Sequence, residues 1–415
     1  MLLTPCSKNS LLALCCLTLG LTHADAQNAN GTQIIGYNNS NDLNAITDLV
    51  NSPFTTFIDG FLMPTANSSV ANPALVFDTL GSSILDSNRV TAFNSVENAG
   101  KNVLLSFGGA GANSYYSAFA NAGVYNGAAY TAAQATQTLA NVLTAYVTGA
   151  SSYTNAVTGA TVPITTYNNS AGTFRGFRGI DLDFEDTQSF QNAGTYQGVQ
   201  FLSQLTIDLR NNLGGGYLIT HAPQTIYLNP AYTQGNNGPF GLPRGGYQAV
   251  LTNGYNTSTP TASVAQLATS WLNVQFYNNP DDGQGTVSGI VQAFEQLVTA
   301  NPGISAGKFV LTLPISAANA NDNYFTSAQI TDIVSQLNTW LKARGDGGIA
   351  GVAGFELYQA ALAGNQGQMD ANNLAFANAI LAGLVVPEPS TWAFVACGVG
   401  LLGWTLRRRR ASGAS

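Results

Sequence analysis

The sequence predicts an α/β fold, a single (β/α)₈ barrel of the TIM type with long loops. Eight short apolar runs, each the length of a strand, recur between residues 31 and 384. Segments with a helical spacing of apolar residues lie between several of these runs, which is the pattern of a parallel sheet covered by helices. A doubly wound open sheet is the alternative, but no glycine-rich phosphate-binding fingerprint follows the first run.

The predicted strands are short and rich in apolar side chains. They are residues 33–37, 55–62, 102–107, 176–185, 217–222, 271–277, 309–314 and 351–357. The predicted helices are residues 131–147, 196–213, 287–298, 327–342 and 372–384, and the polar stretch 151–173 is expected to form an extended loop near the mouth. Because a barrel places its active site at the carboxyl ends of its strands, we expect residues from several strands to converge there on one cleft.

Composition argues against several classes of function. The 415 residues are 8% charged with a formal net charge of −7, which disfavours nucleic acid as a partner because phosphate binding needs a basic face. The four cysteines lie in the apolar segments at the two ends, so the region between has no disulfide and no thiolate nucleophile. His221 is the only histidine between residues 27 and 384, and we expect it to be structural or to contact substrate. We therefore expect neither a metal nor a cofactor.

Residues 179–185, with the sequence GIDLDFE, are the most informative stretch. Apolar and acidic side chains alternate, so a strand here places Asp181, Asp183 and Glu185 on one face. Crowded carboxyl groups push their pKa values apart, which allows one of them to keep its proton near neutral pH and act as a general acid. An acidic edge strand facing solvent, or a cation site, is the alternative interpretation.

The same stretch resembles a known family. Residues 181–185, preceded by Gly179, resemble the DGxDxDxE signature of glycoside hydrolase family 18, the chitinases and their relatives. Residues 106–109 (SFGG) are similar to the SxGG motif of that family, while residues 222–224 (APQ) and 274–279 (VQFYNN) resemble its plant-type branch. The four motifs follow the order of the family, and the resemblance covers residues 31–384 in outline.

The resemblance implies catalysis assisted by a 2-acetamido sugar. Glu185 is expected to protonate the glycosidic oxygen while the acetamido carbonyl oxygen attacks the anomeric carbon of its own sugar. Asp183 is expected to hydrogen-bond the acetamido N–H, Asp181 to share a proton with Asp183, and Tyr277 to orient the acetamido oxygen. The expected substrate contacts lie at the ends of other strands and are Gln275, Asn278, Gln224, Phe355, Tyr37, Phe61 and Gly108.

The implied function is that of a secreted chitinase-like hydrolase acting on chitin or another glycan that contains N-acetylglucosamine. The alternatives are a non-catalytic carbohydrate-binding or surface protein on the same barrel, and an endo-β-N-acetylglucosaminidase. Two positions depart from the pattern of the family: Arg178 replaces the first acidic residue of the signature, and Phe355 replaces a tryptophan that floors the sugar subsite. Glu356 has no family role, so a sugar contact and a salt bridge to an arginine both stay open.

The N-terminus has the three parts of a secretory signal peptide at residues 1–26. Lys8 supplies the positive charge, residues 11–22 are apolar, and residues 24–26 (ADA) form a cleavage site. A short buried helix is the alternative. The catalytic barrel is then expected to occupy residues 27–384.

Residues 385–415 resemble a PEP-CTERM sorting tail. They contain the segment 386–391 (VPEPST), an apolar run at 392–406 and four arginines at 407–410. The arginines are expected to stay on the cytoplasmic side, and the run is short for a stable span. The tail therefore predicts transient membrane contact, cleavage by an exosortase-type peptidase, and a final location in the cell envelope or outside the cell. An ordinary transmembrane anchor is the alternative.

Overall fold

The computed structural model describes the central part of the chain. The described residues are 31–40, 43, 46, 49–109, 117–168, 173–185, 198–229, 246–253, 259–279, 283, 285–320, 323–357 and 366–385. The expected signal peptide, and the sorting tail from residue 386 onward, lie outside these ranges. Within them, no helix combines the length and the apolar character that crossing a membrane requires.

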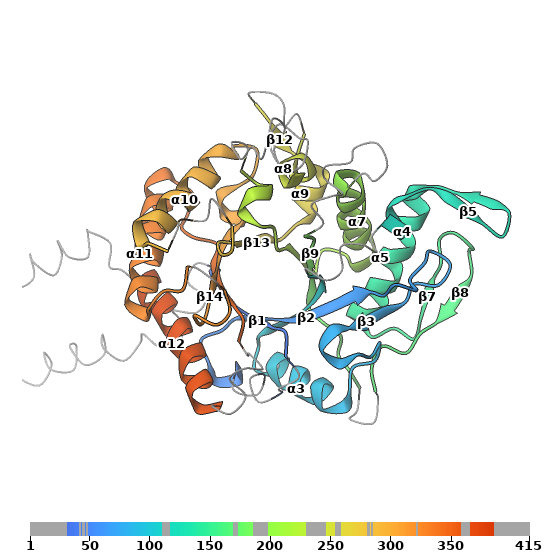
Figure 1. The fold of residues 1–415 in the computed structure, drawn as a ribbon, viewed down its shortest axis with the longest axis horizontal. Helices are drawn as coiled ribbons and strands as arrows, with labels where there is room; N and C mark the ends of the chain where they lie inside the picture. Colours follow the sequence, from blue (N-terminus) through green and yellow to red (C-terminus); the bar gives the residue numbers. More distant parts are fainter. Residues whose placement is uncertain are drawn as a thin grey trace, which may run out of the picture.

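Eight parallel strands form a closed ring, seen end-on in Figure 1. They are β1 (Gln33–Asn38), β2 (Thr56–Pro64), β4 (Asn102–Gly108), β9 (Gly179–Asp183), β10 (Leu218–His221), β13 (Trp271–Gln275), β14 (Phe309–Pro314) and β15 (Gly351–Phe355). Strand β1 closes the ring because it pairs with β15 on one side and with β2 on the other. The predicted barrel is confirmed. The fourth strand is shorter than predicted, because its ladder with β4 runs only from residue 179 to 183.

Helices surround the ring (Figure 1). The longer ones are α3 (Ser87–Asn98), α5 (Ala132–Thr148), α7 (Gly198–Leu213), α10 (Val287–Ala300), α11 (Ser327–Arg344) and α12 (Gln366–Leu384). Five of the six correspond to predicted helices. Helix α3 was not predicted, because polar residues interrupt its apolar positions and leave no clear stripe.

Side-chain caps explain where several of these helices begin. Thr131 and Gln134 form a capping box at the start of α5, and Thr326 and Gln329 form another at the start of α11. In each box the threonine and the glutamine satisfy backbone N–H groups that have no partner inside the helix. Asp86 caps α3 by accepting from two backbone N–H groups, which is worth about 1 kcal/mol. Asp86 was therefore a residue in the sequence from which the start of α3 could have been predicted.

Shorter elements occupy the long connections. They are β3 (Leu75–Phe77), β5 (Gly123–Tyr125), β6 (Ala128–Tyr130), β7 (Ser152–Thr154), β8 (Thr161–Pro163), β11 (Thr252–Asn253), β12 (Thr261–Ala262), α4 (Ser117–Ala120), α8 (Gly246–Leu251), α9 (Val264–Ala268), and 3₁₀ turns at Leu49–Asn51, Asp78–Leu80, Thr225–Tyr227 and Ala306–Lys308. The antiparallel pair β7–β8 corrects the expectation of an extended loop at 151–173. Its turn is shaped by Asn155, whose side-chain oxygen accepts from two backbone N–H groups.

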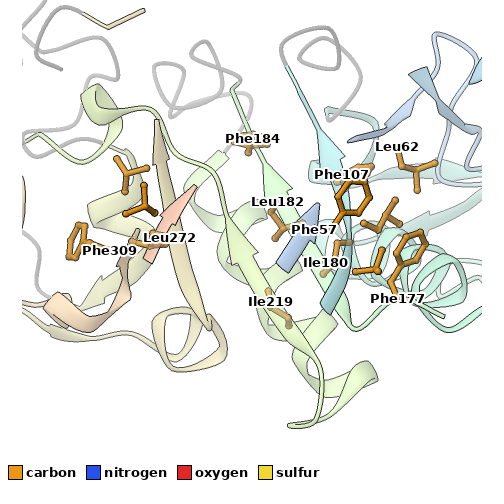
Figure 2. Packing of buried hydrophobic residues seen from close by; sticks show 14 of the residues in the cluster. Phe57, Leu62, Phe107, Phe177, Ile180, Leu182, Phe184, Ile219, Leu272 and Phe309 are labelled. Atoms are coloured by element: carbon orange, nitrogen blue, oxygen red, sulfur yellow. The ribbon is translucent and has the colours of Figure 1, made fainter. Parts of the chain in front are cut away.

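The alternation along the strands separates two apolar layers. Side chains such as Ile180, Leu182 and Phe184 belong to a large cluster between the strands and the helices (Figure 2). A smaller cluster inside the ring includes Ile35, Tyr37, Ile58, Leu104, Ala222, Trp271, Val310 and Ala353. The interior of the barrel is therefore packed, as is usual for this fold, and any cleft must lie above that packing at the ends of the strands.

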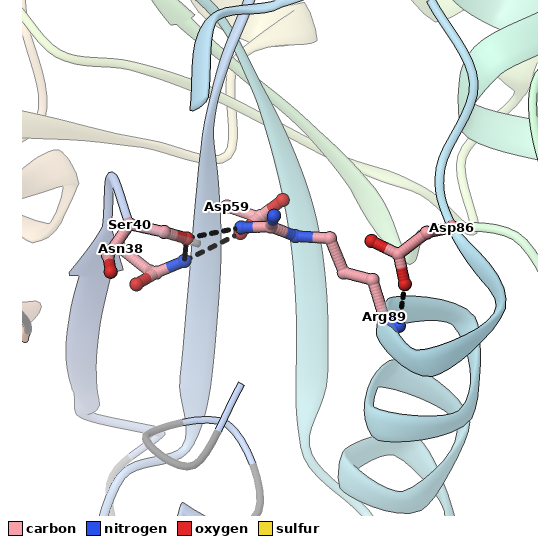
Figure 3. Close-up of polar contacts among 5 residues, drawn as sticks. All are labelled: Asn38, Ser40, Asp59, Asp86 and Arg89. Atoms are coloured by element: carbon pink, nitrogen blue, oxygen red, sulfur yellow. Dashed lines mark hydrogen bonds and ion pairs between the residues drawn. The ribbon is translucent and has the colours of Figure 1, made fainter. Parts of the chain in front are cut away.

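A buried ion pair ties helix α3 to the carboxyl ends of β1 and β2 (Figure 3). Arg89 Nη2 lies 3.0 Å from Asp59 Oδ1, and both side chains are 1% exposed. The same oxygen of Asp59 accepts from Asn38 Nδ2 at 2.9 Å, and Arg89 Nη2 also donates to the carbonyl oxygen of Ser40 at 2.7 Å. Because Asp59 lies two residues before Phe61, these contacts fix the strand ends that lead to the site.

Candidate active site

Three carboxyl groups follow one another along β9 and its end. Asp181 and Asp183 are 0% and 4% exposed, and they lie on the opposite face of β9 from Ile180 and Leu182. Glu185 follows two residues later and keeps part of its surface accessible. The alternation that the sequence predicted is therefore present, and it directs the acidic side chains to the inside of the barrel rather than to solvent.

Asp181 is held by four side-chain donors from four different strands. Tyr37 Oη and Ser106 Oγ donate to Asp181 Oδ2 at 3.0 and 3.1 Å. Asn273 Nδ2 donates to Oδ1 at 3.1 Å, and Thr220 Oγ1 donates to the same oxygen. Burial raises the pKa of Asp181. All four of these hydrogen bonds lower it, because they stabilise the ionised carboxyl group. The carboxyl group of Asp181 is thus fully engaged beneath the site.

Gln275 links the other two carboxyl groups. Its Nε2 lies 3.2 Å from Asp183 Oδ1, 3.1 Å from Glu185 Oε1 and 2.9 Å from the carbonyl oxygen of Ala222. Asp183 and Glu185 are also hydrogen-bonded to each other, which requires a proton on one of them. We had expected Asp183 to share its proton with Asp181. That stays a prediction, and the charges of both Glu185 and Asp181 act on Asp183.

The pKa values of this pair are shifted upward. Burial raises the pKa of Asp183 well above its usual range, and the charges of Glu185 and Asp181 raise it further. Burial also raises the pKa of Glu185, against the hydrogen bonds from Gln275 and Asp183. The pair therefore holds a proton at a pH where an exposed carboxyl group has lost its own, as a general acid must.

Two aromatic rings stand beside the carboxyl groups. Tyr277 and Phe355 are stacked, with their centroids 5.5 Å apart and their planes at 13°. Burial, followed by the charges of Asp183 and Glu185, raises the pKa of Tyr277 well above 10. The hydroxyl group of Tyr277 therefore keeps its proton and is available as a hydrogen-bond donor.

A cavity of about 430 Å³ lies over these groups, within the usual size range of a ligand site. Its lining consists of Asn39, Phe61, Met63, Asp78, Gly108, Gly109, Asp183, Glu185, Gln224, Gln275, Tyr277, Asn278 and Phe355. Two larger hollows, of about 1030 and 590 Å³, lie over α10 and beside α5 and α7. Neither contains any of the three carboxyl groups, so we take the smaller cavity as the candidate site.

The structure brings most of the predicted site residues together. Those that line the cavity are Asp183, Glu185, Gln224, Gln275, Tyr277, Asn278, Phe355, Phe61 and Gly108. Tyr37 and Asp181 do not line it and lie beneath, hydrogen-bonded to each other. Tyr37 thus supports a carboxyl group instead of contacting substrate as expected. Gln275 was also expected to contact substrate, and its amide group is engaged mainly with the carboxyl groups.

Sequence reasoning missed several residues of the site. Asn39, Met63, Asp78 and Gly109 line the cavity. The first three belong to no recognised motif, whereas Gly109 is the last residue of the SFGG motif and was not assigned to the site. Thr220 and Asn273, which hold Asp181, were also missed. Thr220 precedes His221 on β10, and Asn273 alternates with Gln275 on β13. Polar residues within buried strands were a usable signal because buried polar groups need partners.

The structure also places three residues that the sequence singled out but did not assign to the site. Glu356 accepts a hydrogen bond from the backbone of Asn39, and burial raises its pKa to about 8; it forms neither of the two ion pairs found among the described residues. Arg178 is exposed at the other end of β9 from the cavity. His221 is fully buried, with Nε2 3.2 Å from Thr206 Oγ1. It is therefore structural.

In the part of the chain that the structure covers, no group of three or more histidine, cysteine or acidic side chains is arranged to hold a metal ion. The three carboxyl groups of the β9 stretch are instead engaged with protein donors and with each other. The chemistry that these residues support is proton transfer within a carboxyl pair, next to an aromatic wall and several amide groups.

Comparisons with known proteins give results of two kinds. A search of curated proteins returns no match. Among solved structures, a GH18 chitinase from Pseudoalteromonas aurantia matches with 22% sequence identity and a TM-score of 0.60, over 85% of this chain and 100% of that chain. A family GH18 chitinase from Chromobacterium violaceum matches with 17% identity and a TM-score of 0.52, over 85% of this chain and 83% of that chain. At these identities the likeness establishes the fold.

At the C-terminus, residues 385–410 match the family model of the PEP-CTERM protein-sorting motif. The expected tail is thereby confirmed as a sorting signal. The chain therefore has the barrel fold of the solved family 18 chitinases and ends in a PEP-CTERM motif that directs it to the cell envelope or outside the cell.

Proposed function

We propose that the protein is a chitinase-like glycosidase that cleaves β-1,4 bonds next to N-acetylglucosamine with retention of configuration. The observation that carries the proposal is the hydrogen-bonded chain of Asp183, Gln275 and Glu185 on the wall of the cavity. The resemblance of the strand-end motifs to family 18, and the fold shared with its solved members, support the same activity. A fold alone does not decide activity, so the proposal rests on the site.

Glu185 is assigned as the general acid. It is the member of the pair that keeps accessible surface, whereas Asp183 is buried beneath it. The raised pKa of Glu185 favours the protonated form that must meet the glycosidic oxygen. As the bond between that oxygen and the anomeric carbon breaks, the proton of Glu185 leaves with the departing sugar.

The attacking oxygen is assigned to the acetamido group of the substrate. Asp181, Asp183 and Glu185 come from one strand and therefore share one side of the cavity. A retaining enzyme with a carboxylate nucleophile needs its two carboxyl groups on opposite sides of the scissile bond. With the acetamido carbonyl oxygen as nucleophile, a positive oxazolinium ring forms, and the carboxyl group of Asp183 stabilises it. Water then opens the ring, with Glu185 accepting its proton.

Other residues of the cavity wall are assigned to binding. Tyr277, protonated and beside the acidic pair, donates to the acetamido oxygen and orients it for attack. Phe355 supplies an apolar surface for the sugar ring, in the place where the family has a tryptophan. Gln224 and Asn278 present polar groups at the rim. The PEP-CTERM motif implies that an exosortase-type peptidase processes the enzyme during export.

The test compares the full-length protein with its Glu185→Gln variant. Each is incubated with chitin oligomers and with a high-mannose glycoprotein, and the products are identified by mass. The glutamine has the same size but cannot donate the proton, so turnover is expected to fall about 10²–10⁴-fold. Glu295→Gln, on helix α10 outside the cavity, is the matched control and is expected to keep full activity.

The outcomes separate the candidate functions. Release of short N-acetylglucosamine oligomers supports a chitinase, and release of an intact glycan from the glycoprotein supports an endo-β-N-acetylglucosaminidase. Binding of oligomers without any cleavage would show a non-catalytic carbohydrate-binding protein. Unchanged turnover in Glu185→Gln would remove Glu185 from its assigned role.

A further inference from the structure

Strand β13 carries three side chains in succession on the face that points into the barrel. They are Trp271, Asn273 and Gln275, and the residues between them belong to the outer apolar cluster. Gln275 donates to the two carboxyl groups at the cavity, and Asn273 donates to Asp181 beneath them. Trp271 is 8% exposed and packs in the small cluster inside the ring. The chemistry proposed above gives this tryptophan no role.

The indole group of Trp271 determines which way the amide group of Asn273 points. Trp271 Nε1 lies 2.9 Å from Asn273 Oδ1, and an indole N–H is a donor only, so the atom that it meets must be the amide oxygen. The other end of the amide, Nδ2, then donates to Asp181 Oδ1 at 3.1 Å. Asn273 and Asp181 are both 0% exposed. Within this chain of hydrogen bonds, the amide group can only donate to the carboxyl group.

The other three side-chain donors to Asp181 are not restricted in this way, because they are hydroxyl groups. They belong to Tyr37, Ser106 and Thr220. A hydroxyl group can donate to a carboxylate, or it can turn and accept from a protonated carboxyl group. An unrestrained asparagine amide can reverse as well, by presenting its oxygen. Among these four partners of Asp181, Asn273 is therefore the one that a second contact holds as a donor.

We propose that Trp271 is a positioning residue of the site: its indole N–H holds the amide group of Asn273 as a hydrogen-bond donor, which favours the ionised form of Asp181. An ionised Asp181 places a negative charge near Asp183, and that charge raises the pKa of Asp183. The carboxyl pair above therefore holds its proton more tightly. The link to catalysis rests on the proposed function, whereas the effect of Trp271 on Asp181 does not.

The groups that titrate around Asp181 decide how its ionisation can be measured. Among the described residues, Tyr37 and Tyr277 interact electrostatically with Asp181, and the pKa of each is raised well above 10, so both stay neutral. Asp183 interacts with Asp181 directly, and Glu185 acts on Asp183 from the end of the strand. The titration of Asp181 must therefore be followed separately from the titration of these two carboxyl groups.

The experiment follows the side-chain carboxyl group of Asp181 by carbon-13 NMR in the full-length protein, labelled at its aspartates. Its signal is identified as the one that disappears in Asp181→Asn, and the chemical shift is recorded across the acid and neutral range. Trp271→Phe removes the indole N–H and keeps an aromatic ring inside the barrel. Replacing Trp271 by benzothienylalanine, which has sulfur in place of the N–H, preserves the size of the ring system and serves if the phenylalanine variant does not fold.

In Trp271→Phe the titration midpoint of Asp181 is expected to move upward by about one pH unit, the size expected when one hydrogen bond to a charged group is lost. The direction follows because the released amide of Asn273 can turn its oxygen toward the protonated carboxyl group. Benzothienylalanine is expected to have the same effect. Trp340→Phe, on α11 where the ring lies against Arg344, is the matched control and is expected to leave the midpoint in place.

A double substitution separates positioning from packing. In the Asn273→Leu background, Trp271→Phe is expected to cause no further change in the midpoint of Asp181, because the indole acts through the amide. A midpoint that stays in place or moves downward in Trp271→Phe overturns the inference. A change of equal size in the Asn273→Leu background overturns it as well, since the tryptophan would then act through packing alone. Either result leaves the proposed function standing.

Turnover of a chitin oligomer gives the second measurement. In Trp271→Phe the acid limb of the kcat profile is expected to move upward together with the midpoint of Asp181, while KM stays unchanged. The reason is that a protonated Asp181 withdraws negative charge from beneath the positive ring that forms as the bond breaks. A midpoint that moves without the acid limb overturns the positioning role. Absence of turnover in the unsubstituted protein overturns the proposed function, and the titration still decides whether Trp271 controls Asp181.

Discussion

Gln275→Leu is expected to shift the alkaline limb of the pH profile of turnover to higher pH. The substitution removes the Nε2 group that donates to Asp183 and Glu185. Those hydrogen bonds favour the ionised carboxyl groups and lower both pKa values. Without them the pKa of Glu185 rises, so the acid stays protonated to higher pH. The alkaline limb of the pH profile is therefore expected to move upward.

The size of the shift follows from the bonds that are lost. A hydrogen bond to a charged group contributes about 1.5–3 kcal/mol, and about 1.4 kcal/mol corresponds to one pKa unit. The single Nε2 group is shared among three acceptors, so about one unit is expected for Glu185. The carbonyl oxygen of Ala222 also loses its side-chain donor, which is expected to cost about 1–3 kcal/mol of stability.

The assay is kcat/KM on a chitin oligomer between about pH 4 and pH 9, with unfolding by urea measured on the same preparations. Gln336→Leu, in an exposed position on helix α11, is the control and should leave the profile where it is. A limb that stays in place, or that moves to lower pH, would refute the assignment of Gln275 as the group that sets the proton affinity of the pair.

Two further predictions concern stability. Arg89→Met leaves the buried carboxyl group of Asp59 without its cation and is expected to cost about 3–5 kcal/mol in urea unfolding. Arg344→Met, at an exposed pair, is expected to cost at most about 1 kcal/mol; equal costs would contradict the burial argument. His221 has its pKa lowered to about 3 by burial, so its stabilising contribution is complete above about pH 6.5 and is lost as the pH falls from there. His221→Gln should flatten the decline in stability by about 1.4 kcal/mol per pH unit in that range, and an unchanged slope would contradict this.

The part of the site that the sequence predicted is the part that local patterns encode. The alternation in residues 179–185 places Asp181 and Asp183 inside the barrel, and the structure agrees. The eight strands were found for the same reason, because apolar runs of strand length recur between helical segments. The ends of those runs then indicated where side chains from distant parts of the chain meet.

The part that was missed depends on contacts between strands. Asp181 is held by donors on other strands, such as Thr220 and Asn273, and Gln275 on β13 links Asp183 with Glu185. No single segment contains that information. The role of Tyr37 changed for the same reason, since its ring lies below the cavity and its hydroxyl group reaches a carboxyl group on β9.

Hydrolysis of a fully N-acetylated chitin tetramer, compared with the fully deacetylated tetramer, tests the assisted mechanism most directly. The first-formed product is read by NMR before its anomers equilibrate. Cleavage of the acetylated tetramer alone, with the β-anomer formed first, is the expected result, because only that substrate carries the attacking carbonyl oxygen. Equal cleavage of both tetramers, or the α-anomer as first product, would contradict the mechanism and point to a conventional carboxylate pair, with Glu356 as the partner of Glu185.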